Sequence, residues 1–139
     1  MRLTLFISVG LLAGCNPVLI RADQDNFTFH AGSAGIQPFV AALERRLGAS
    51  VQARDIDFPG SDVSRLFSLS GRGVTVVVNP IPDDRCNPNA PLHATYKEAE
   101  YRIDLVYDTQ SQSDRQSAKH ILDDSAKEVG QKLVPFREC

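Results

Sequence analysis

The sequence predicts an α+β fold, in which a small, mostly antiparallel sheet of four or five strands carries two helices packed on one face. Two observations predict this fold. Several short segments have alternating apolar residues, as strands do, and two longer segments have apolar residues at helical spacing. Their order is strand, helix, strand, an uncertain strand, two further strands and a helix. A length of 139 residues supports one domain, and 42% hydrophobic with 23% charged residues is typical of a globular protein rather than a disordered one.

The first strand and the first helix are predicted by their apolar spacing. Residues 26–30 place Phe27 and Phe29 on one face, as in a short strand. Beyond a glycine-rich break, helical spacing continues to Gly48, and Pro38 is tolerated because it lies in the first turn. The apolar positions of this helix are Ile36, Phe39, Val40, Leu43 and Leu47.

The middle of the chain predicts strands and leaves one choice open. Residues 51–58 form a strand that Pro59-Gly60 closes. Residues 61–70 fit either a helix capped by Ser61 or a strand, and we favour a hairpin with residues 74–79, the strongest strand of the chain. A loop with four prolines follows at residues 80–92, and residues 100–107 alternate like an antiparallel strand with one solvated face.

The last helix is predicted from a capping box and an apolar stripe. Ser113 with Gln116 fits the box, and Asp114 suits the positive start of a helix. Pro135 ends the helix. The stripe comprises Ala118, Ile121, Leu122, Ala126 (or Ser125), Val129 and Leu133.

The N-terminal segment predicts export. Residues 3–12 are almost continuously apolar behind Arg2, and this run is shorter than the roughly 20 residues that cross a bilayer. It fits the apolar region of a secretory signal, and the alternative is a buried strand or helix of the fold. The run ends in Leu12-Ala13-Gly14-Cys15.

These four residues resemble the lipobox of bacterial lipoproteins. The resemblance implies transfer of a diacylglyceryl group to the Cys15 thiol, cleavage between Gly14 and Cys15, and acylation of the new amine by a fatty acid such as palmitate. The chain then divides into a signal peptide (1–14), a lipidated tether (15–24) and a single α+β domain (25–139). Two or three acyl chains would anchor it stably, since each buried methylene adds about 0.8 kcal/mol. An ordinary cleaved signal, with Cys15 kept as a thiol, is the alternative.

The residue after Cys15 predicts which membrane would hold the lipoprotein. In the enterobacterial sorting rule an Asp there retains a lipoprotein in the inner membrane. Asn16 stands in that position. We therefore expect the outer membrane, with the domain facing the periplasm.

The two remaining cysteines predict a disulfide. Cys86 lies in the proline-rich loop and Cys139 is the last residue, and an exported protein with two such cysteines allows one bridge. The alternative is two free thiols. A metal site is disfavoured because no CxxC or HxxxH spacing accompanies them.

The other polar residues of the sequence favour ordinary structural roles over binding or catalytic sites. A net charge of −2 argues against nucleic-acid binding. No catalytic motif, cofactor site or metal site is predicted, so we expect a protein that is not an enzyme. The features considered were Gly32 with Gly35 as an anion-binding turn, the scattered His30, His93 and His120, the pair Asp55 and Asp57, and Asp83 and Asp84 with Asn87 and Asn89.

Two functions follow as expectations. The first is a lipid-anchored envelope protein that acts as a non-catalytic binding or assembly module, docking through an exposed sheet face or an edge strand at residues 96–107. In element order alone the chain resembles small helper lipoproteins such as the lipopolysaccharide-assembly lipoprotein, with two helices on a small sheet. The second is a periplasmic immunity protein or inhibitor of a toxin or lytic enzyme, which would insert the loop at residues 83–91.

Overall fold

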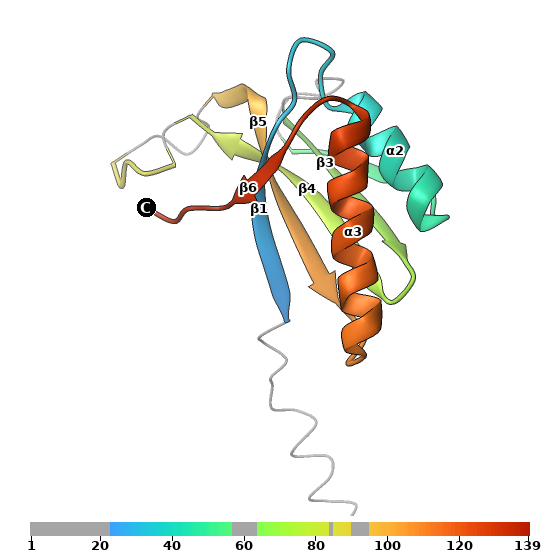
Figure 1. Cartoon of the computed structure of the whole chain (residues 1–139). Coiled ribbons are helices and arrows are strands. Elements are labelled where there is room, and N and C mark those ends of the chain that lie inside the picture. Colours follow the sequence, from blue (N-terminus) through green and yellow to red (C-terminus); the bar gives the residue numbers. More distant parts are fainter. Residues whose placement is uncertain (1–22, 57–63, 84, 90–94) are drawn as a thin grey trace, which may run out of the picture.

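The fold is α+β, as predicted: a six-stranded antiparallel sheet with two helices packed on each other and on one face of it (Figure 1). The computed structural model describes residues 23–56, 64–83, 85–89 and 95–139. The strands are β1 (Gln24–His30), β2 (Gln52–Asp55), β3 (Arg65–Gly71), β4 (Val74–Pro82), β5 (Tyr96–Tyr107) and β6 (Leu133–Pro135), and the helices are α2 (Gln37–Leu47) and α3 (Gln112–Glu128). The sheet order is β2-β3-β4-β5-β1-β6.

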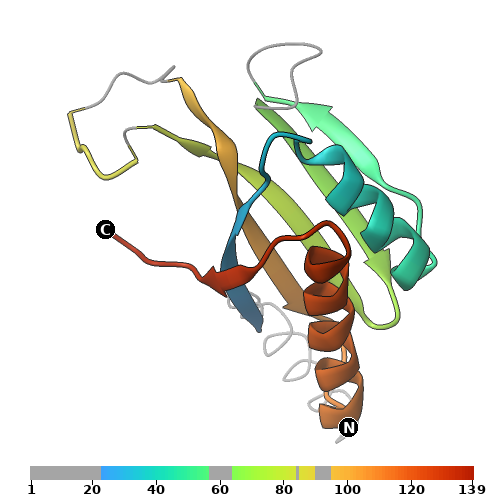
Figure 2. The same cartoon turned by 45° about the horizontal axis from the view of Figure 1, so that its top comes forward.

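The core fills the space between the sheet and the helices. Every second residue of β4 and β5 points to the helices, which is the period of a strand, and Val78 and Ile103 are fully buried there. Phe29 of β1 stacks on Phe39 of α2 with 4.1 Å between ring centroids. Figure 2 shows both helices lying over the same face of the sheet. We call this the covered face, and the opposite one the open face.

The hairpin of β3 and β4 confirms the strand interpretation of residues 65–70. Gly71 pairs with Val74, so two residues form the turn. These are Arg72 and Gly73, with φ of 54° and 80°, the left-handed values that a tight hairpin turn requires. Gly71 also lies against the end of α2, where an added Cβ would meet the Leu47 carbonyl oxygen at 2.9 Å.

The boundaries of the last helix differ from the prediction. The N-cap is Ser111, whose hydroxyl accepts from the Asp114 N–H, and not Ser113. The helix ends at Glu128, and Gly130 with φ of 74° turns the chain away. Leu133 therefore packs on the core from β6, a sixth strand beyond the four or five predicted. Its position in sequence continued the helical spacing, which is why the pattern misplaced it.

The sheet also corrects the prediction for residues 80–107. β4 continues to Pro82, inside the expected proline-rich loop, because a register shift between Pro80 and Pro82 accommodates residues that lack an N–H donor. β5 begins at Tyr96 and lies between β4 and β1, so it is a central strand and not an edge strand. The outer strands are β2 and β6. Within the described ranges, no helix is long and apolar enough to cross a membrane.

Candidate functional site

The C-terminal strap, residues 136–139, crosses the open face beyond β6. The Phe136 N–H donates to the Asn26 carbonyl at 3.1 Å, continuing the path of β6 along β1. The Phe136 ring then lies 5.6 Å from the guanidinium of Arg102, which β5 presents on the open face. The strap ends at the disulfide between Cys139 and Cys86, the pairing expected from the sequence. A covalent bond therefore ties the last residue to the segment that follows β4.

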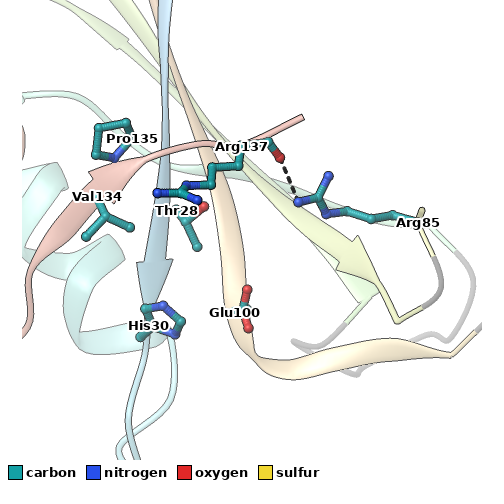
Figure 3. Close-up of a pocket in the computed structure, with 7 residues that line it drawn as sticks. All are labelled: Thr28, His30, Arg85, Glu100, Val134, Pro135 and Arg137. Atoms are coloured by element: carbon teal, nitrogen blue, oxygen red, sulfur yellow. Dashed lines mark hydrogen bonds between the residues drawn. The ribbon is translucent and has the colours of Figure 1, made fainter. Parts of the chain in front are cut away.

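Arg85 holds the strap in place from the segment beside the disulfide. Its guanidinium donates to the Arg137 carbonyl at 2.7 Å (Figure 3). It also donates to Cys139 Sγ at 3.4 Å. It also lies 4.7 Å from the centroid of the Phe136 ring, within the range of a cation–π contact. These contacts occupy the Arg85 guanidinium and leave it little freedom to bind another group.

A polar network underlies the strap. Asp104 of β5 is only 8% exposed, although it lies on the open face. Its carboxylate accepts from Asn26 Nδ2 at 2.5 Å, Asn79 Nδ2 at 2.8 Å and Arg102 at 3.0 Å. The network fixes Arg102 below Phe136, and the buried Nε of Arg102 has no hydrogen-bond partner among the described residues. The site is thus supported by a rigid polar base rather than an apolar core.

A groove of about 590 Å³ lies beside the strap (Figure 3). Its floor comes from β1 and β5, and its sides come from β6, the strap and the segment after β4. In Figure 3 the Arg137 side chain extends back over Thr28, away from Arg85. The lining residues are Thr28, His30, Arg85, Glu100, Val134, Pro135 and Arg137. The groove combines two guanidinium groups with one carboxylate, so its charge is positive.

A second polar cluster lies where β1 begins, beside α3. The Tyr107 hydroxyl donates to Asp25 at 2.6 Å, and Lys119 Nζ is 3.2 Å from the same carboxylate oxygen. The Tyr107 hydrogen bond, with the positive charge of Lys119, lowers the pKa of Asp25 below its ordinary value. Burial, followed by the bond to Asp25, raises the pKa of Tyr107. Arg115 joins the cluster by an ion pair with Asp23 at 2.5 Å. Because its charges are paired, the cluster fastens the start of β1 to α3.

The structure brings together few of the residues that the sequence offered as possible sites. His30 lies in the groove, whereas Asp55 binds Arg65 at 2.8 Å, and Gly32 and Gly35 form the turn between β1 and α2. Among the described residues, no group of three or more potential metal ligands lies together. Asp83 accepts a hydrogen bond from the Thr95 hydroxyl at 2.6 Å, and the Asn87 side chain accepts one from the Asn89 N–H at 3.0 Å. His120 is exposed on α3. The other residues named from the sequence, Gly14, Cys15, Asp57, Asp84 and His93, lie outside the described ranges.

Sequence reasoning did not single out Arg85, Arg137, Thr28 or Glu100 as site residues. The only signal toward them was the cysteine pair, which linked the end of the chain to the segment that holds Arg85. The comparisons with known proteins found no family model and no curated protein that match this chain. The groove and the N-terminal sequence are therefore the features of this chain that bear on its function.

Proposed function

We propose that this chain is a lipid-anchored envelope protein that binds another protein through the groove beside its C-terminal strap. The lipobox at Cys15 supports the anchor, and the Cys86–Cys139 disulfide is compatible with an oxidising compartment such as the periplasm. The expected tether of about nine residues gives a reach of roughly 15–18 Å, so the domain would stay near the membrane surface.

The position of the groove is the observation that carries the proposal. His30 and Glu100 pair at the end of β1 that lies away from the tether, whereas Gln24 pairs with Val106 at the tether end. Six residue steps of a strand separate the two ends by roughly 20 Å. The groove therefore lies at the end of β1 opposite Gln24, and an anchor on the Gln24 side would leave it accessible to a protein partner.

The anchor is tested by replacing the lipidated residue. In a Gram-negative host, the wild-type chain should incorporate labelled palmitate and sediment with membranes. Cys15→Ser should lose the label and leave the membrane fraction. A Cys15→Ser chain that stays processed and membrane-bound would contradict the anchor.

The binding surface is tested with photo-crosslinking residues at two matched positions. Val134 borders the groove and is 38% exposed, and Ile56 follows β2 at the opposite side of the sheet and is 43% exposed. A crosslinker at Val134 should give a discrete protein adduct in cells, and one at Ile56 should not. The adduct should weaken when Cys15→Ser removes the anchor. Adducts at Ile56 alone, or at neither position, would contradict the proposed surface.

The alternative, a periplasmic inhibitor, is favoured by one observation. The disulfide and the Arg85 contacts brace the segment at residues 85–89, as an inserted loop requires. Under this alternative the crosslinked protein is a toxin or lytic enzyme, and its activity falls when the purified chain is added. An adduct whose activity is unchanged would leave the binding-module proposal in place and exclude inhibition.

A further inference from the structure

We infer that the groove recognises an acidic residue in a peptide segment of the partner, with Arg137 as the main contact to the carboxylate. This inference rests on the proposed function and names the chemistry of its partner. It is carried by the free guanidinium, the balance of charge around it and the apolar flank beside it.

The Arg137 guanidinium is exposed and available. In the described part of the chain its side chain makes no hydrogen bond or ion pair, whereas Arg85 in the same groove is committed to the strap. Several other arginines pair with carboxylates, such as Arg65 with Asp55 and Arg115 with Asp23. A guanidinium presents its donors as a planar fork that matches a carboxylate with two parallel hydrogen bonds.

The surrounding charges favour an anion. Arg85 and Arg137 face one carboxylate, Glu100, which lies 3.7 Å from Lys97 Nζ and is partly compensated by it. Thr28 and His30, both on β1, add a hydroxyl and an imidazole to the floor of the groove (Figure 3). Donors therefore outnumber acceptors, and a ligand has to supply acceptor oxygens.

A peptide fits this lining better than a small free acid. The Glu100 carboxylate can accept an N–H from the ligand, and an acidic residue in a peptide has a backbone N–H close to its carboxylate. Val134 and Pro135 form an apolar flank for the stem of the same side chain or its neighbour. The volume of about 590 Å³ lies within the range of roughly 300–1,000 Å³ that is usual for ligand sites.

The inference is tested by the affinity of two short peptides. The probes are fluorescent, capped peptides of sequence Gly-Val-Glu-Val-Gly and Gly-Val-Gln-Val-Gly, titrated by anisotropy into the full chain purified in mild detergent with its disulfide intact. The Glu peptide should bind at least about tenfold more tightly, because hydrogen bonds to charged groups are worth more than neutral ones. Arg137→Gln should abolish this preference.

The matched control is Arg54→Gln. Arg54 is an exposed arginine on β2, the outer strand at the opposite side of the sheet, and its replacement should keep the preference for the Glu peptide. Thermal melting of both variants should match the wild type, because neither arginine side chain is used in the fold. Equal binding of the two peptides, no binding of either, or a preference that survives Arg137→Gln would overturn the inference.

Competition distinguishes a peptide from a small anion. Succinate and inorganic phosphate should displace the Glu peptide only at concentrations far above that of the unlabelled peptide. Displacement at equal concentration would assign the groove to a small anion and overturn the peptide assignment. If the Val134 adduct forms in cells but Glu and Gln peptides bind alike, this inference fails and the proposed function stands. If the Glu peptide binds selectively but no adduct forms, the proposed function fails.

Discussion

The two faces of the sheet are held by different forces. The centre of the covered face is apolar, and residues such as Phe29, Val78 and Ile103 are fully buried there against the helices. The open face carries the Asp104 network, the Arg85 contacts and a disulfide, with the groove beside them. The first is stabilised by exclusion of water and close packing, and the second by directed polar bonds and one covalent bond. The comparison indicates that close apolar packing on one face leaves the other face, held by polar bonds and a disulfide, free to carry the groove.

The largest expected effect is on the covered face. Phe29→Ala removes a fully buried ring that stacks on Phe39 and leaves a cavity between β1 and α2. We expect the free energy of unfolding to fall by about 3–5 kcal/mol in urea denaturation.

Val106→Ala is the control for this prediction. Val106 is half-buried on the open face, and its truncation should cost less than about 1 kcal/mol. Equal costs at the two positions would contradict the view that apolar packing stabilises the covered face more than the open face.

The next effect comes from the disulfide of the open face. Cys86→Ser with Cys139→Ser opens a loop closed over a separation of 53 residues, worth about 4 kcal/mol in the chain-entropy model and less if the reduced state retains order. We expect a loss of about 2–4 kcal/mol and weaker Arg85 contacts to the strap. The helices and strands that enclose the covered face should persist, which a nearly unchanged far-UV circular dichroism spectrum would report.

Mass spectrometry of the non-reduced wild type checks the premise. A mass two hydrogens below that of the reduced chain, with peptides around Cys86 and Cys139 joined, is the expected result. A non-reduced protein that lacks this link would remove the basis of the strap.

The covered face was largely predictable because its signals are local. Alternation in β5 and helical spacing in α2 fixed which side chains point inward, and Gly48 marked the end of α2. The sequence did not predict β6, because a strand of three residues ending in Pro135 is too short to show an alternating pattern. Its Leu133 instead matched the helical stripe of α3.

The groove was not predictable from spacing. It joins β1, β5, β6, the segment after β4 and the strap, and these contacts depend on the sheet order rather than on neighbouring residues. Alternation placed Asp104 on a solvated face, but the burial of its carboxylate depends on Asn26 and Asn79, which lie far away in sequence. Only the cysteines carried long-range information, since a pair of them implies a contact.

The smallest of the three expected losses, after those at Phe29 and at the disulfide, sharpens the comparison within the open face. Asp104→Asn keeps the shape of the side chain but replaces one acceptor oxygen by a donor, so Asn26, Asn79 and Arg102 compete for fewer acceptors. Because the site is nearly buried, we expect a loss of about 1–3 kcal/mol in urea denaturation. Replacing Asn79 by Asp in the same chain restores a carboxylate to the network and should recover part of this loss. If the Asp104→Asn variant is as stable as the wild type, water satisfies the donors of Asn26, Asn79 and Arg102. The open face would then depend on the disulfide and the Arg85 contacts alone.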